Sequence, residues 1–109
     1  MTELSASLMP LRAKFIASIL PRLAELETLR RQVSADAAGM QALTEIGHVA
    51  HRISGVAATL GFARAGELAS EVDRQATAVR SGQELFAWAW PRTEPVLEAL
   101  MDELEAQLD

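Results

Sequence analysis

The feature that most constrains the fold of this chain is the stretch of residues 40–60, which reads MQALTEIGHVAHRISGVAATL. Six apolar residues recur in it at alternating spacings of three and four: Leu43, Ile46, Ala50, Ile53, Ala57 and Leu60. This spacing places one apolar seam along a single face of an α-helix. A helix of this length is about 30 Å long, which is the length of a small helical bundle. The seam therefore requires further helices that cover it.

The rest of the chain predicts those helices. Its dominant residue types favour helix, and it has no sustained strand-type alternation. We expect helices at about 10–20, 21–34, 40–60, 62–80 and 93–108, with the segment Thr93-Glu94-Pro95 as the N-terminus of the last one. The predicted fold class is all-α, an antiparallel four-helix bundle with a short extra N-terminal helix across or beside one end. We expect residues 1–109 to form a single domain.

One segment departs from the helical pattern. Phe86, Trp88 and Trp90 alternate with other residues between the last two long helices. We interpret this segment as a connection whose aromatic side chains lie on the bundle and close one end. The alternative is an aromatic patch that faces a partner, because Trp is common at the centres of protein interfaces.

Composition and charge exclude several classes of function. Fifteen acidic residues against ten basic ones give a net charge of −5, and Arg30-Arg31 is the only adjacent basic pair, so we expect no nucleic-acid partner. The longest stretch without a charged residue has 11 residues, 53–63, whereas a membrane span needs about 20. The absence of cysteine and of a secretory signal favours the cytoplasm. Because no helix carries a second apolar seam, we expect a monomer.

His51 is the candidate functional residue. At about 100° per residue it points about 130° away from the seam, and His48 and Gly55 point almost opposite the seam, so we expect an exposed imidazole. Gly47 and Gly55 accompany it on the same face, although glycine inside a helix costs about 1 kcal/mol relative to alanine. Such a face leaves space for a bulky partner. Neutral imidazole is nucleophilic at physiological pH, so the pattern predicts an imidazole offered to a macromolecule.

The segment AHRISGVAATLGF, residues 50–62, resembles the signature of histidine-containing phosphotransfer (HPt) domains, in the positions His51, Ile53, Ser54, Gly55 and Gly61. The resemblance covers essentially the whole chain. It implies that His51 carries a phosphoryl group to or from the aspartate of a response-regulator receiver domain. It also implies a sensor or hybrid histidine kinase as a partner. The receiver is expected to bring Mg²⁺, and the chain is expected to have no cofactor of its own.

The family frequently has lysine where this chain has Ser54. Arg52 or Arg64 is expected to supply the missing positive charge, or the Ser54 hydroxyl to donate a hydrogen bond instead. Gly55 and Ala58 are candidate docking contacts, together with Val56, whereas Leu60 belongs rather to the core. We interpret His48 as an exposed neighbour that tunes the charge near His51; a metal site with Glu45 or Glu67, or a second phosphoryl acceptor, is the less favoured alternative.

The resemblance and the residues together predict a phosphocarrier, not an enzyme with its own nucleotide site. The chain has no G-x-x-x-x-G-K-[ST] motif and no glycine-rich nucleotide loop. Two alternatives stay open. One is an HPt-like bundle that binds and regulates a receiver or a kinase without carrying phosphate. The other is the phosphoacceptor domain of a larger chemotaxis-type kinase.

Overall fold

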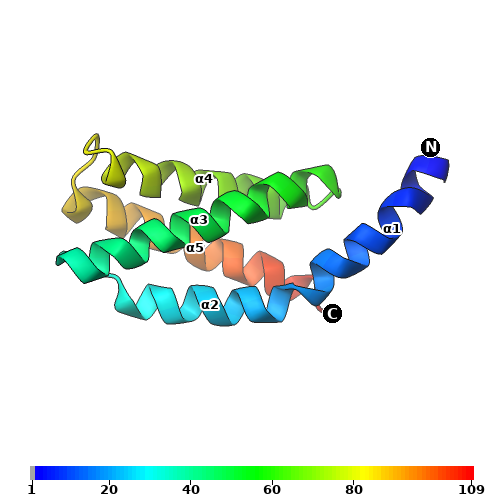
Figure 1. The fold of residues 1–109 in the computed structure, drawn as a ribbon, viewed down its shortest axis with the longest axis horizontal. Helices are drawn as coiled ribbons and strands as arrows, with labels where there is room; N and C mark the ends of the chain where they lie inside the picture. The colour runs from blue at the N-terminus through cyan, green and yellow to red at the C-terminus, as the bar shows by residue number, and fades with distance from the viewer. Residues whose placement is uncertain (1) are drawn as a thin grey trace.

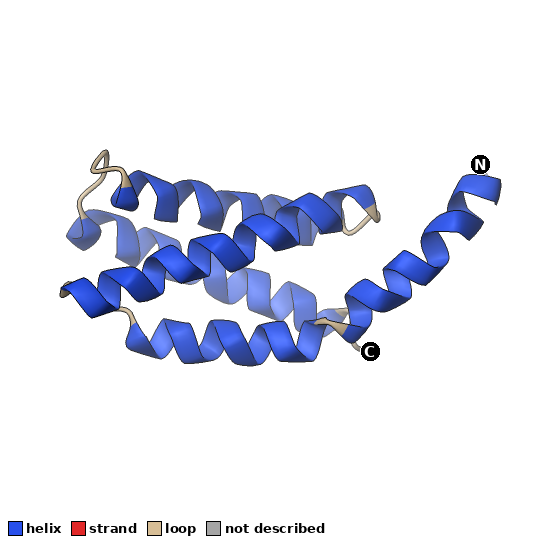
Figure 2. Cartoon of the chain, viewed as in Figure 1, coloured by secondary structure: helices blue, strands red, loops and turns tan. Residues whose placement is uncertain are grey.

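The computed structural model describes residues 2–109, with side chains from residue 7 onward, and in this range the chain forms five helices and no strand (Figures 1 and 2). They are α1 (Thr2–Ala17), α2 (Ile19–Gln32), α3 (Ala37–Thr59), α4 (Ala63–Arg80) and α5 (Phe86–Ala106). Helices α2 to α5 run up and down beside one another and are joined by the short connections 33–36, 60–62 and 81–85. The predicted all-α, antiparallel four-helix bundle with an extra N-terminal helix is confirmed.

The predicted seam of α3 forms the centre of the core. All six of its residues are buried, and Ile46, Ala50 and Ala57 are fully inaccessible to solvent. The neighbouring helices contribute buried aliphatic side chains opposite this seam, among them Leu26, Val72, Leu97, Leu100 and Leu104. Because α3 is covered on this face along its whole length, its opposite face is the only part of the helix that reaches solvent.

Helix α1 is longer than the predicted helix at 10–20, and its N-terminal half projects from one end of the bundle (Figure 1). The predicted start at Pro10 is wrong, because helix-favouring residues before it continue the helix at the loss of one backbone hydrogen bond. The helix ends at Ala17, four residues before Pro21. In a continuous helix the ring of Pro21 would collide with the Ala17 carbonyl, and Pro21 has no N–H to donate to it.

The C-terminal half of α1 is held by the turn between α3 and α4. The Arg12 guanidinium donates to the Leu60 carbonyl and lies 4.5 Å from the centre of the Phe62 ring. Phe15 stacks on the same ring at a centroid distance of 4.9 Å. These contacts fix the end of α1 beside the C-terminal turns of α3.

Helix α5 begins at Phe86, so the predicted helix start at Thr93 is wrong. Thr93 is buried inside the helix, and its hydroxyl lies 2.8 Å from the Ala89 carbonyl oxygen and 2.5 Å from Gln75 Oε1. Pro91 and Pro95 both lie within α5. Each removes a backbone hydrogen bond. Burial of one face from Phe86 onward outweighs this loss.

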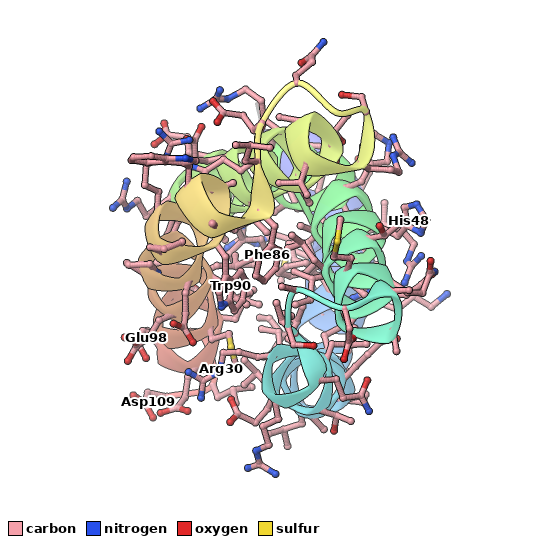
Figure 3. All side chains as sticks on the ribbon, turned by 90° about the vertical axis from the view of Figure 1, so that its left-hand side faces the viewer. Arg30, His48, Phe86, Trp90, Glu98 and Asp109 are labelled. Atoms are coloured by element: carbon pink, nitrogen blue, oxygen red, sulfur yellow. The ribbon has the colours of Figure 1, made fainter. Side chains whose placement is uncertain are left out.

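The aromatic segment is therefore helical and not an irregular connection. Phe86 and Trp90 are one turn apart, stack at 6.5 Å and point between the helices (Figure 3), which confirms that these two side chains lie on the bundle. Trp88 lies on the other side of the helix and is 69% exposed. The apparent period of two arose because two of the three aromatics share a helical face and the third does not.

Candidate functional site

His51 lies in the C-terminal half of α3, and its side chain is 75% exposed, as predicted. Its Nδ1 atom is 2.9 Å from Oδ2 of Asp73 on α4. The Asp73 side chain is only 28% exposed, and its other oxygen accepts from the Thr77 hydroxyl at 3.3 Å. The imidazole is thus exposed to solvent and oriented by a neighbouring helix at the same time.

This contact selects one form of the imidazole. A carboxylate has no hydrogen to donate, so the hydrogen in the His51–Asp73 contact belongs to Nδ1. In the neutral ring, Nε2 then carries the free lone pair. Of the two ring nitrogens, Nε2 is therefore the one whose lone pair is available to react.

Asp73 was not among the residues that the sequence analysis selected. A signal for it exists in the register of the two helices, since His51 precedes Phe62 by eleven residues and Asp73 follows it by eleven. Phe62 lies in the turn that joins α3 and α4, and antiparallel neighbours place residues at equal distances from their turn opposite each other. To find Asp73 from the sequence, one must know which residue lies at the centre of that turn. Periodicity within one helix does not provide this position.

The other candidates for charge around His51 are placed differently. The Ser54 hydroxyl donates to the His51 carbonyl at 2.9 Å, so it serves the backbone of its own helix. Arg64, at the start of α4, lies 3.9 Å from the Glu67 carboxylate. Arg52 is exposed, and its side chain has no hydrogen bond or ion pair with any residue that the structure describes. Of the two arginines, Arg52 is therefore the one whose positive charge is not paired within the described part of the chain.

The two glycines beside His51 occupy different environments. Gly47 is buried, which corrects the expectation that it belongs to the exposed face, because a Cβ atom there would lie 2.8 Å from the Cβ of Ala76 on α4. Gly55 is exposed, and a Cβ atom there would meet nothing within 4 Å. The predicted docking residues Val56 and Ala58 are also exposed. Gly47 therefore serves the packing of α3 on α4, and Gly55 lies on a surface open to a partner.

His48 lies one turn before His51 and is also exposed, at 48% of its side chain (Figure 3). Its Nδ1 atom is 3.7 Å from Oε1 of Glu45, which is too long for a hydrogen bond. Both histidines line a hollow of about 320 Å³ between α3 and α4 that also includes Arg80. Among the residues that the structure describes, no three histidine or acidic side chains are grouped so as to hold a metal ion.

The acidic groups with shifted pKa values lie away from His51. The pKa of Asp36 is lowered because its carboxylate accepts from the Gly39 N–H and the Ser34 hydroxyl at the start of α3. Hydrogen bonds from Arg30 and Arg74 lower the pKa values of Glu27 and Glu71, respectively. These interactions stabilise helix ends and surfaces and leave the site to the His51–Asp73 pair.

Comparison with known protein families assigns the chain to one of them. The family model of the Hpt domain matches residues 10–107. The chain belongs to the Hpt domain family. No curated protein and no solved structure matches it significantly.

Membership places this Hpt domain in a general class of function. Hpt domains take part in histidine phosphotransfer in two-component systems, where they act as phosphocarriers and interact with receiver domains and kinases. In the part of the chain that the structure describes, no helix is long and apolar enough to cross a membrane.

Proposed function

We propose that this Hpt domain carries a phosphoryl group on Nε2 of His51, to or from the aspartate of a response-regulator receiver domain. The observation that carries the proposal is the exposed imidazole whose Nδ1 is held 2.9 Å from Asp73. A buried histidine has no access to a partner protein, and an exposed histidine without a partner has no fixed tautomer. His51 combines access with orientation.

In the transfer step, the Nε2 lone pair attacks the phosphorus of the receiver's aspartyl phosphate. The N–P bond forms while the bond between phosphorus and the aspartate oxygen breaks, and the aspartate leaves as a carboxylate. The proton on Nδ1 stays on the ring, which becomes cationic, and Asp73 stabilises this charge. Transfer in the opposite direction reverses each change.

The partner completes the chemistry. The receiver supplies Mg²⁺ and the groups that stabilise the transferring phosphoryl group, and this chain contributes the imidazole and a docking face. Gly55, Val56 and Ala58 form the part of that face that follows His51 on α3, and Arg52 offers an unpaired positive charge beside it. Ser54 and Arg64 contribute less, because the Ser54 hydroxyl and the Arg64 guanidinium already have partners within the chain.

His48 is a neighbour of the site and not the acceptor. The acidic group beside it is Glu45 of its own helix, at 3.7 Å, whereas His51 has a hydrogen-bonded carboxylate from a packed neighbouring helix. Its ring therefore lacks the contact that selects a tautomer. Its charge state still affects the electrostatic potential around His51.

A transfer assay tests this proposal. The chain is mixed with phosphorylated receiver domains encoded in its own genome, and phosphohistidine is followed by intact mass and peptide mapping. We expect transfer to wild type and to His48→Gln, and none to His51→Gln. Transfer that persists in His51→Gln contradicts the assignment. A chain that binds a receiver tightly and never exchanges phosphate with it is instead a regulatory bundle without carrier activity.

A further inference from the structure

The hollow of about 320 Å³ between α3 and α4 extends from His51 toward the N-terminal half of α3. Two small residues, Gly47 and Ala76, face each other in it, and both are buried. Because these two positions carry no bulky side chain, the space between the helices stays open. None of the described residues that line the hollow has a large apolar side chain, so it suits a polar ligand.

The charges in this hollow are unevenly distributed. Asp73 is the one acidic residue among the described residues that line it. Its Oδ2 lies 2.9 Å from His51 Nδ1, and its Oδ1 accepts from the Thr77 hydroxyl at 3.3 Å, so both oxygens are engaged within the chain. Arg80 lies about two turns of α4 beyond Asp73, and His48 lies on α3 one turn before His51. The hollow is therefore basic beyond Asp73.

The basic groups of the hollow have free hydrogen-bond donors. Arg80 is exposed, and its guanidinium has no hydrogen bond or ion pair with any residue that the structure describes. The Nδ1 atom of His48 lies 3.7 Å from the Glu45 carboxylate, which is too long for a hydrogen bond. The hydroxyls of Thr44 and Thr77 already donate within their own helices. The free donors are thus the guanidinium, with five N–H groups, and the His48 ring, which has an N–H in either charge state.

These features together favour an oxyanion as the ligand. The planar fork of a guanidinium matches two oxygens of a phosphate group, and hydrogen bonds to charged oxygens are strong. We propose that Arg80 and His48 form an oxyanion subsite beside His51. It holds phosphate oxygens, either of the phosphoryl group carried on His51 or of free inorganic phosphate. For the first of these sources the inference rests on the proposed function.

Arg80 was not among the residues that the sequence analysis selected. The two cations considered there, Arg52 and Arg64, do not line this hollow. Like Asp73, Arg80 reaches the same hollow as His51 through the register of α4 against α3. Periodicity within one helix does not provide that register, so folding alone shows which cation lies in the hollow.

Nitrogen-15 NMR of the Arg80 side chain tests the subsite and separates the two sources of phosphate. The unphosphorylated chain is titrated with inorganic phosphate, and chloride is adjusted so that the ionic strength stays constant. In a second sample, His51 is phosphorylated with phosphoramidate, a small donor that phosphorylates imidazole without a protein partner, and the excess donor is removed. We expect the Nε–H signal of Arg80 to shift in both samples. The signal of Arg74, which does not line the hollow, should stay in place.

The pattern of shifts identifies the occupant. A shift in the titration alone assigns the subsite to free phosphate, and a shift on phosphorylation alone assigns it to the phosphoryl group on His51. An Arg80 signal that stays in place in both samples overturns the proposal. An equal shift of the Arg74 signal also overturns it, because the response would then not depend on the hollow.

Substitutions measure how much Arg80 contributes where free phosphate binds. Arg80→Gln should raise the Kd for inorganic phosphate about tenfold, because hydrogen bonds to a charged group are lost; the ring signals of His48 report binding in this variant. Arg80→Lys keeps the charge without the planar fork and should recover part of the affinity. The matched control Arg74→Gln removes the same charge from an exposed position of α4 and should keep the wild-type Kd. Equal losses in Arg80→Gln and Arg74→Gln would contradict the subsite.

The same samples distinguish a failure of the subsite from a failure of the proposed function. If neither a receiver nor phosphoramidate labels His51 while inorganic phosphate still shifts the Arg80 signal, the carrier function fails and the subsite stands. If His51 is labelled and the Arg80 signal responds neither to the phosphoryl group nor to inorganic phosphate, only the subsite fails.

Discussion

The two turns of α3 on either side of His51 look equivalent in sequence and differ in the structure. Gly47 lies four residues before His51, and Gly55 lies four residues after it. Gly47 is needed inside the molecule, because a Cβ atom there would collide with Ala76 of α4. Gly55 has open space around it. Packing within the chain therefore does not explain the glycine at position 55, which is consistent with the proposed docking of a partner there.

The same division applies to the charges around His51. On the α4 side, Asp73 holds the imidazole from within the bundle. Toward α1 and α2, Lys14, Arg22 and Arg52 line one groove, and their side chains have no hydrogen-bond or ion-pair partner among the described residues. In the proposed function, the α4 side of His51 orients the imidazole and the side toward α1 and α2 is left for recognition of the partner. A change on the α4 side of His51 should affect the rate of transfer from every phosphoryl donor. A change on the side toward α1 and α2 should affect the rate from protein donors alone.

The largest effect is expected from placing a bulky side chain at the exposed position 55. Gly55→Trp should lower kcat/KM for transfer from the receiver by about 100-fold or more, because a central side chain that holds the partners apart removes about 2.7 kcal/mol or more of interface energy. Labelling by phosphoramidate should stay at the wild-type rate. The matched control Ala87→Trp adds the same bulk at an exposed position of α5 and should transfer normally. Normal transfer in Gly55→Trp would show that the partner does not cover this turn.

A change at Asp73, on the α4 side of His51, should affect the rate of transfer from both donors. Asp73→Asn should slow labelling by the receiver and by phosphoramidate alike, by about 10- to 100-fold, as is usual for residues that orient a reactive group. Asp73→Glu should restore part of the rate. Nitrogen-15 chemical shifts of the His51 ring provide a readout that a merely structural role would not move. They should show hydrogen on Nδ1 in wild type and a mixture of tautomers in Asp73→Asn; an unchanged tautomer would contradict the role of Asp73.

The two glycines should respond to alanine with opposite signs. Gly47→Ala should lower the free energy of unfolding by about 1 kcal/mol, because the collision with Ala76 outweighs the gain in helix propensity. Urea denaturation measures this difference. The double variant Gly47→Ala, Ala76→Gly should recover part of the loss, since the two sites are in contact. A strictly additive double variant would show that the collision is not the cause.

The smallest effect is expected at the other glycine. Gly55→Ala should raise the free energy of unfolding by about 0.5–1 kcal/mol, because the new Cβ meets no neighbour and alanine favours helix. The same urea titration measures it. A loss of stability in this variant would contradict the open environment of Gly55 and the contrast with Gly47.

Much of the fold was predictable because it depends on periodicity within one helix. The burial of Ile46 and Ile53 and the exposure of His51 both follow from about 100° of rotation per residue, and the structure confirms them. The start of α5 was predicted wrongly, since Thr93 resembles a helix cap in a local reading and is a buried residue of the helix interior. Burial of a whole face outweighed the local signal of cap and proline.

The phosphoryl role of His51 stays a prediction that the transfer assay tests, and the same holds for the docking roles of Gly55 and Ala58. By itself, the sequence determined the helical class, the seam of α3 and the exposed position of His51, because each depends on neighbours within a few residues of the chain. The tertiary structure decided that Asp73 holds Nδ1, that Gly47 packs against Ala76 and that Lys14 lies in one groove with Arg52. These depend on the register and packing between helices, which is set only when the apolar faces come together in the bundle.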